Sequence, residues 1–201
     1  IAALLGAFRL MAQLMYGCGL RLMECCRLRV KDIDWERRVL NVRGGKGDKD
    51  RNVPLPESII AELQAHLAQN KIRFDHDGGW PVHLPDGLLR KFPSYEREWA
   101  WQYVFAAKSL SMDDVDGRLK MHHIHENSLQ KAVHAAVRLC GFTKRITCHT
   151  FRHSFATHLL EAGVAIYDVQ KLLGHSRVET TMIYNHVAAP IERRIKSPLD
   201  L

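Results

Sequence analysis

The apolar residues in the first part of the chain recur at the spacing expected for one face of an α-helix. This pattern runs through residues 1–15 with no capping residue before it, and it continues to Leu28 after the sequence Tyr-Gly-Cys-Gly at 16–19. Because glycine interrupts helices, we predict two helices separated by this turn, with Arg21 opening the second. Since Ile1 already lies inside the helical pattern, we expect that residues upstream of it have been removed.

Alternation of apolar and polar residues then predicts a β-hairpin. Its strands are residues 39–42 and 51–55, and the glycine-rich stretch 44–48 between them forms a long tip that carries Lys46. Pro56 is suited to the first position of the next helix. We predict this helix to run to about Gln69, with an apolar face formed by Ile59, Ile60, Leu63 and Leu67.

Helical periodicity fails between about residues 72 and 125, where glycines at 78 and 79 and prolines at 81, 85 and 93 interrupt the chain. We predict that this stretch is an insertion. The spacing by two from Trp99 to Phe105 would place four aromatic rings on one face if this part is extended, whereas a helix would scatter them. The insertion holds half of the chain's sixteen aromatic residues, which are Phe74, Trp80, Phe92, Tyr95, Trp99, Trp101, Tyr103 and Phe105.

Two helices with recognisable ends are predicted after the insertion. Asn127 can cap the first, with Gln130 three residues further on, and Gly141 ends it. The second begins at a possible cap, Thr147, and stops at Gly163. Apolar side chains form a stripe along each of these helices, so both are expected to pack against a core.

Two further helices are predicted near the C-terminal end. Residues 166–173 form one, and Gly174 closes it. Ser176 and Glu179 have the spacing of a capping box, which predicts a last helix that carries Tyr184.

The composition favours an anionic partner. Twenty-nine Lys and Arg against 22 Asp and Glu give a net charge of +7, and nucleic acid is the commonest partner of basic domains. Mild basicity alone is also common in domains that bind no nucleic acid. The five cysteines contain no C-x-x-C pair, which fits a reduced cytoplasmic compartment, and no apolar run reaches the length of a membrane span.

Four segments carry residue types suited to chemistry on a phosphate group. Taken singly, each has an ordinary structural explanation, such as an ion pair between Arg21 and Glu24 one helical turn apart or a tyrosine in the core. His149 and Arg152 project from one face of a first helical turn, where unpaired amides and the helix dipole favour an anion. The candidates are Arg21, Lys46, His149, Arg152, His175 and Tyr184.

In this order and spacing, these segments resemble the tyrosine recombinase (phage integrase) family. The resemblance covers nearly the whole chain and rests on YGCGLR at 16–21, GKG at 45–47, HTFRH at 149–153, LLGH at 172–175, and Tyr184. It is closest to the integron integrases, through residues 20–34 and 147–160, the sequence KSPLD at 196–200, and the extra segment containing WAWQY at 99–103.

The resemblance implies an α+β fold, mainly α-helical with a small antiparallel sheet, in which residues 1–201 form the catalytic domain. The N-terminal DNA-binding clamp of the family is absent from this chain. The resemblance also implies DNA as partner, as duplex or as folded single-stranded hairpin sites. Family members act as tetramers on DNA, and the segment 191–201 is suited to dock on a neighbouring protomer.

The chemistry explains why these residue types are needed. Charge moves onto the non-bridging oxygens of a phosphodiester during attack, so the guanidiniums of Arg21 and Arg152 would stabilise the transition state. A tyrosine hydroxyl, with a pKa of about 10, needs a neighbouring base or cationic field to become a nucleophile. The resemblance assigns Tyr184 as nucleophile and His149, supported by His175, as the group that activates it.

Lys46, on the hairpin tip, would by the same resemblance protonate the departing 5′-oxygen. The phosphotyrosine bond keeps the energy of the broken phosphodiester, so rejoining requires neither ATP nor a metal and we expect no cofactor. Two other interpretations have little support, because neither has the further ligands it requires. These are a metal site at His122, His123 and His125, and a calcium loop at Asp113, Asp114 and Asp116.

The insertion leaves two interpretations open. Its aromatic rings either anchor it to the core or stack on bases that stand outside a folded hairpin. For the second interpretation the candidate DNA-binding residues are Trp99, Trp101, His123 and His125. Three other functions are weighed against an integron integrase, namely a recombinase acting only on duplex sites, a type IB topoisomerase, and a DNA-binding module without catalysis.

Overall fold

The computed structural model of the protein describes residues 1–43, 50–175, 179–182 and 184. Helix α1 (Gly6–Gly17) and helix α2 (Leu22–Cys26) are separated by a turn, and Arg21 is the N-cap of α2 as predicted. The expectation that the first helix begins at residue 1 is wrong. Gly6 has a φ of 51°, so the chain enters α1 through a left-handed residue that does not continue a helix backwards.

The predicted hairpin is confirmed outside its tip. Strand β2 (Val39–Val42) pairs antiparallel with β3 (Arg51–Pro54) on one side and with β1 (Ile33–Asp34) on the other. Leu40 faces Val53 in this register, and both side chains are fully buried. A 3-10 turn, η1 (Val30–Asp32), leads from α2 into the sheet. Lys46 lies outside the described residues.

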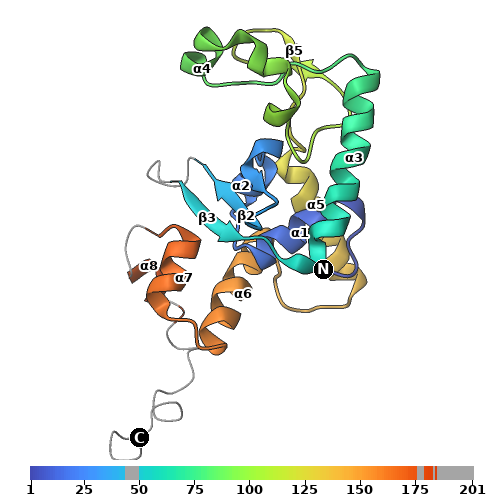
Figure 1. The fold of residues 1–201 in the computed structure, drawn as a ribbon. Coiled ribbons are helices and arrows are strands. Elements are labelled where there is room, and N and C mark those ends of the chain that lie inside the picture. Colours follow the sequence, from blue (N-terminus) through green and yellow to red (C-terminus); the bar gives the residue numbers. More distant parts are fainter. Residues whose placement is uncertain (44–49, 176–178, 183, 185–201) are drawn as a thin grey trace, which may run out of the picture.

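Helix α1 lies in the centre of the main core, where Met11 and Leu14 are fully buried. It packs against α6 (Cys148–Glu161) and also contacts α5 (Glu126–Leu139). Figure 1 shows α6 and α7 (Ile166–Leu173) side by side below the sheet, with α8 (Glu179–Met182) beside α7. These helices form a second core cluster that includes Phe155 and Leu173.

The helix after the hairpin is longer than predicted. The turn η2 (Glu57–Ile59), with Pro56 as its N-cap, precedes α3 (Ile60–His76), which continues past Gln69. The polar residues after Leu67 weaken the helical pattern, but Phe74, two residues before the end of α3, packs in the core of the insertion. Tertiary contact therefore extends the helix beyond the point where its periodicity fails.

The insertion is a small unit carried at the end of α3, as Figure 1 shows. Short elements make it up, and a core cluster of six residues that includes Trp80, Tyr103 and Met121 holds them together. The segment from Trp99 to Trp101 is a 3-10 turn and not the extended stretch considered above. The elements are α4 (Asp86–Lys91), η3 (Pro93–Arg97), η4 (Trp99–Trp101), β4 (Ser111–Met112) and β5 (Leu119–Lys120).

The predicted helix ends are largely found. Thr147 is the N-cap of α6 and Gly174 closes α7, but the cap of α5 is His125, whose ring nitrogen accepts a hydrogen bond from the backbone of Asn127. Ser176 lies outside the described residues. Tyr184 follows α8 in a turn and is not part of that helix, which ends at Met182. None of the described helices is both long and apolar enough to cross a membrane.

Candidate active site

Arg152 is almost completely buried at the junction of three segments. Only 2% of its surface is exposed. One terminal nitrogen donates to the carbonyl of Gly19 at 2.6 Å, and the other donates to the carbonyl of Leu173 at 2.5 Å. Burial, followed by the charge of Arg21, lowers the pKa of Arg152 to about 10, so the guanidinium stays charged at neutral pH.

Gly19 gives Arg152 this position. The residue has a φ of 63°, and a Cβ atom there would come within 2.5 Å of the Phe155 ring on α6. A larger residue would therefore have to push α6 away from the turn before α2. The glycine thus allows the carbonyl to approach Arg152 closely enough for the hydrogen bond.

Arg21 lies at the start of α2 and forms the ion pair with Glu24 that its spacing suggested. Its backbone N–H and one terminal guanidinium nitrogen donate to the two carboxylate oxygens of Glu24 at 2.8 and 2.7 Å. The Arg21 side chain is still 30% exposed, and it lines the same cavity as Arg152. The structural and the catalytic interpretations of Arg21 are therefore compatible.

Arg51 is a site residue that the sequence did not indicate, and Glu24, expected only as a partner of Arg21, connects Arg51 to the site as well. Arg51, at the start of β3, donates two hydrogen bonds to the Glu24 carboxylate at 2.9 and 2.7 Å and a third to the carbonyl of Leu172 at 2.8 Å. The same carboxylate is 3.8 Å from Arg152. Burial acts to raise the pKa of Glu24, but the hydrogen bonds from Arg51 and Arg21 outweigh it and lower this pKa to about 2.

His175 follows Gly174 and connects Arg152 to the segment before Tyr184. Its Nε2 lies 3.2 Å from a terminal nitrogen of Arg152, and its Nδ1 lies 2.9 Å from the hydroxyl of Thr181 on α8. Burial and then the charge of Arg152 lower the pKa of His175 to about 4. The imidazole is therefore neutral at pH 7 and can accept from Arg152 at Nε2 only if its proton is on Nδ1.

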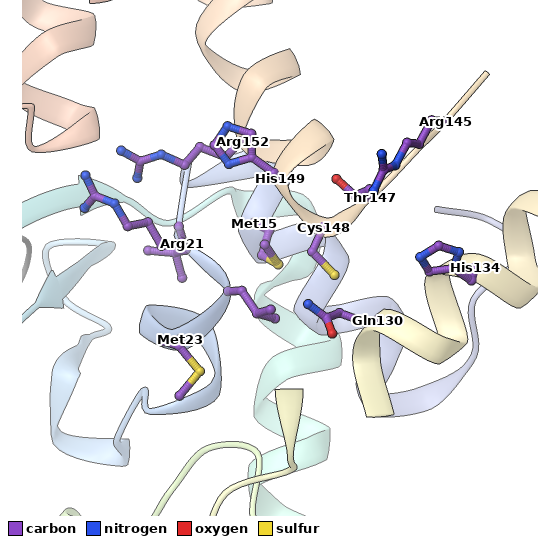
Figure 2. Close-up of a pocket in the computed structure, with 12 residues that line it drawn as sticks. Met15, Arg21, Met23, Gln130, His134, Arg145, Thr147, Cys148, His149 and Arg152 are labelled. Atoms are coloured by element: carbon purple, nitrogen blue, oxygen red, sulfur yellow. The ribbon is translucent and has the colours of Figure 1, made fainter. Parts of the chain in front are cut away.

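His149 is exposed on the first turn of α6 and lines a cavity of about 540 Å³ together with Arg21 and Arg152. Figure 2 shows these three side chains grouped at one end of the cavity, with His134 and Arg145 at the other end. Five arginine and histidine side chains thus line a space large enough for a phosphodiester. No carboxylate lines this cavity among the described residues.

Tyr184 is buried, with 2% of its surface exposed, and it packs in the second core cluster with Phe155 and Leu173. Its ring centroid lies 4.8 Å from that of His153. Burial raises the pKa of Tyr184, and the charge of Arg152 acts in the opposite direction. The phenol therefore lies within the field of Arg152 but does not line the cavity of Arg21, His149 and Arg152.

Comparison with known proteins agrees with this arrangement. A model of the phage integrase family matches residues 7–190. The chain belongs to the phage integrase family. An integrase/recombinase of Escherichia coli is 45% identical to this family member over 198 residues, which are 97% of the chain and 59% of that relative. The tyrosine recombinase XerA of Pyrococcus furiosus is 34% identical over 182 residues, 90% of the chain and 50% of the relative.

Solved structures confirm the fold class of this phage integrase family member. The crystal structure of XerA recombinase matches with a TM-score of 0.61 and 27% identity over 94% of the chain and 57% of that protein. The XerH site-specific recombinase, solved with its difH substrate after cleavage, has a TM-score of 0.65 at 22% identity, over 94% of the chain and 44% of XerH. The chain therefore spans roughly half of the relatives it matches.

The four predicted DNA-binding residues of this family member lie in the insertion and at its junction with α5. Trp99 packs against Phe74, with ring centroids 5.4 Å apart, and contacts both the main core and the core of the insertion. Trp101 is half-buried. His123 bonds the carbonyl of Ile124 through Nδ1, and His125 caps α5.

Four of the six residues weighed as metal ligands lie within 4.0 Å of an ion-pair partner, namely His122, His125, Asp113 and Asp116. Lys120 is buried and lies 2.6 Å from Asp116 and 3.6 Å from Asp113. His83 and His122 lie 3.4 and 4.0 Å from the same Asp113 carboxylate. In the part of the chain that the structure describes, no group of three or more potential ligands is arranged to hold a metal ion.

Proposed function

We propose that this protein is a site-specific recombinase that cleaves and rejoins DNA strands through a 3′-phosphotyrosine intermediate on Tyr184. One observation carries the proposal. The Glu24 carboxylate contacts both Arg21 and Arg152, and these two arginines line a cavity whose wall includes no carboxylate of the described residues. Tyr184 lies close enough for the charge of Arg152 to act on its phenol. Membership of the phage integrase family supports the same reaction.

In the proposed reaction, the scissile phosphate lies in the cavity that Arg21, His149 and Arg152 line. Arg21 has an exposed guanidinium edge that can bind the phosphate directly. Arg152 is fixed behind it by two carbonyl groups and supplies a charge that needs little rearrangement as the reaction proceeds. The attraction between these two guanidiniums and the phosphate becomes stronger as negative charge grows on the non-bridging oxygens.

The covalent step forms a bond between the phenolic oxygen of Tyr184 and the phosphorus, and breaks the bond from phosphorus to the 5′-oxygen. The phenolic proton passes to His149, which has an exposed ring at the cavity. His175 is neutral and engaged with Arg152 and Thr181, so its role is to position Arg152 and the segment leading to Tyr184. The 5′-oxygen takes a proton from Lys46 and leaves as a hydroxyl.

Trapping of the covalent intermediate tests this proposal. The full-length protein is incubated with a nicked DNA site, from which the cleaved 5′ fragment diffuses away, and the adduct is mapped by peptide mass analysis. We expect an adduct at Tyr184 and none with Tyr184→Phe, which removes one hydroxyl and little packing area, while DNA binding stays within about twofold. DNA binding without adduct in the unaltered protein would instead favour a non-catalytic DNA-binding module. Relaxation of a supercoiled plasmid without recombination would favour a type IB topoisomerase.

We further propose that the substrates include folded single-stranded sites, as in capture of gene cassettes by an integron integrase. A stack of aromatic rings in the insertion supports this. Phe92 lies 4.7 Å from Tyr95, and Tyr95 lies 5.4 Å from Trp101, measured between ring centroids. The ammonium nitrogen of Lys31 lies over the Trp101 ring, 3.2 Å from its centroid. Such a stack beside a cation suits an unpaired base and a phosphate. A recombinase restricted to duplex sites is the alternative.

We also propose that the active form is a tetramer on DNA and that the segment 191–201, which lies outside the described residues, docks on a neighbouring protomer. The relatives extend well beyond the matched region, which supports assigning this chain to the catalytic domain of a longer protein. Truncation after residue 190 should abolish the tetramer in sedimentation of the protein–DNA complex. Tetramers that form without this segment would contradict the proposed docking.

A further inference from the structure

A series of three hollows runs along α2 from the candidate active site to the insertion. The first is the cavity of Arg21 and Arg152, and Met23 lines both this cavity and the second. Arg27 and Arg29 line both the second hollow and the third. In Figure 1, α2 lies between α6 and the insertion. These shared residues place the second hollow, whose wall also includes Glu24 and Asp32, between the cavity of Arg21 and Arg152 and the junction of the core and the insertion.

The third hollow, here called the junction cavity, is strongly basic. It has a volume of about 410 Å³, within the range of about 300–1,000 Å³ typical of small-ligand sites. The core contributes Arg27 and Arg29 to its wall, and the insertion region contributes three histidines, His83, His122 and His123. Tyr103 adds a phenol. None of the described carboxylates lines the junction cavity.

The two arginines of the junction cavity have charge that no described carboxylate neutralises at close range. Arg29 donates to the carbonyls of Trp101 and His83 at 2.5 and 2.8 Å, and both acceptors are neutral. Arg27 is exposed. No carboxylate of the described residues forms an ion pair with either guanidinium within 4.0 Å. Cations that are fixed beside a cavity without a counter-ion favour an anionic ligand.

The acidic side chains near this cavity have cationic partners of their own. Asp32, whose charge acts on Arg29, forms an ion pair with Arg43 at 2.8 Å. Asp113 lies behind His83 and His122, and its carboxylate is 3.4 Å from Nδ1 of His83. Lys120, which is 2% exposed, balances Asp113 from the other side. Burial and then the repulsive charge of Arg27 lower the pKa of His123, while the Ile124 carbonyl and the charge of Glu126 act in the opposite direction. An anion in the cavity would relieve this repulsion.

We propose that the junction cavity binds a phosphate group of the DNA strand that continues from the scissile phosphate along α2. This inference rests on the proposed function, because it requires DNA in the first cavity. The guanidinium of Arg27 and the imidazole of His122, whose Nε2 has no hydrogen-bond partner among the described residues, supply the donors, and Arg29 supplies fixed charge. The insertion thereby extends the region of the protein that contacts the DNA backbone beyond the catalytic residues.

A phosphate-by-phosphate substitution experiment tests this assignment. The full-length protein is bound to DNA sites in which one phosphate at a time is replaced by an uncharged methylphosphonate. In the unaltered protein, we expect lower affinity for substitution at the scissile phosphate and at one separate position. With Arg27→Ala, the affinity for unmodified DNA should fall about tenfold, and sensitivity at the separate position should disappear while that at the scissile phosphate remains.

Arg138→Ala is the matched control, because Arg138 is an exposed arginine on α5 that lines none of the three hollows. It should leave both sensitive positions in place. If the scissile position is sensitive but no separate position depends on Arg27, the junction cavity does not bind the DNA strand. If no position is sensitive, the proposed function itself fails, and the two failures are thus distinguishable.

A free phosphate compound is the other source of the same ligand chemistry. Titration of the protein with inorganic phosphate in the absence of DNA separates the two sources. Phosphate binding that depends on Arg27, without an Arg27-dependent position in the DNA, would overturn the assignment to the DNA strand. An Arg27-dependent position in the DNA, with inorganic phosphate competing only at millimolar concentration, would support it.

Discussion

Arg51 and Glu24 form a two-point ion pair at the centre of the candidate active site. The two terminal nitrogens of Arg51 lie 2.9 and 2.7 Å from the carboxylate oxygens, and the side chains are 7% and 8% exposed. Arg51 is the first residue of β3, the second strand of the hairpin. Glu24 accepts a hydrogen bond from Arg21 and lies 3.8 Å from Arg152. The pair therefore fixes the base of the hairpin relative to Arg21 and Arg152.

Replacement of Arg51 by Ala is expected to lower the free energy of unfolding by about 3 kcal/mol, because it leaves the Glu24 carboxylate buried without its main partner. Arg21 still donates to Glu24, which keeps the loss at the lower end of the range for broken buried pairs. Urea denaturation measures the change. Arg38→Ala, which breaks the exposed pair with Glu57, is the control and should cost less than about 1 kcal/mol. Equal losses in the two variants would contradict the central position of Arg51.

Replacement of Arg152 by Lys is expected to reduce the rate of adduct formation by at least about 100-fold. A single ammonium cannot reach the carbonyls of Gly19 and Leu173 from one position while also bonding His175, because these acceptors lie on separate segments. Single-turnover cleavage of a nicked site measures the rate. Near-normal cleavage would show that a point charge is sufficient and that the planar guanidinium is not needed.

The stability of the protein should fall as the pH is lowered from about 6.5 to 4. The pKa of His175 is lowered to about 4 in the folded protein, so over this window the unfolded chain binds a proton that the folded chain does not. Glu24, with its pKa lowered to about 2, adds a second loss only below about pH 4.5. Urea denaturation at pH 7, 6, 5 and 4 follows both effects.

His175→Gln should reduce the slope in the upper part of this pH profile, because it removes the histidine with the large pKa shift. His66 and His123, whose pKa values burial also lowers, should keep a smaller slope. His134→Gln, which changes an exposed histidine at the other end of the cavity, is the control and should keep the slope of the unaltered protein. An unchanged slope in His175→Gln would show that another group titrates in this window.

Lys46→Ala is expected to slow cleavage of an ordinary phosphodiester by about 100-fold, because the departing 5′-oxygen then lacks its acid. On a substrate with sulfur at the 5′-bridging position, the loss should be less than about tenfold, since sulfur leaves without a proton. Cleavage rates on the two substrates are compared in single turnover. Equal losses on both would assign Lys46 to phosphate binding alone.

Trp101→Ala should weaken binding to a hairpin with unpaired bases by about 1 to 3 kcal/mol while sparing a fully paired duplex. Trp99→Ala is the matched comparison, because Trp99 packs against Phe74 and both neighbouring cores. Its main expected effect is a lower melting temperature. Affinity for both DNA forms and thermal melting are measured for each variant. A large fall in melting temperature for Trp101→Ala, or equal losses on hairpin and duplex, would assign the residue to the core.

The sequence alone determined the local features of this protein. The hairpin strands, the cap at Thr147 and the end of α7 at Gly174 follow from residues close together in the chain. Turn geometry and capping depend on a few neighbouring residues, so a short pattern is enough to specify them. The order of the motifs likewise indicated the family, which the match over residues 7–190 establishes.

Only the tertiary structure decided how these features combine. Arg152 donates to the carbonyl of Gly19, which is 133 positions away in the sequence, and Arg51 pairs with Glu24, which is 27 positions away. Helix α3 continues into the insertion because Phe74 packs in the core of that unit. Nothing in the local pattern of Tyr184 shows whether its ring is exposed or packed against α6 and α7. Such contacts depend on which distant surfaces the folded chain brings together, and burial then sets the charge state of His175 and Glu24.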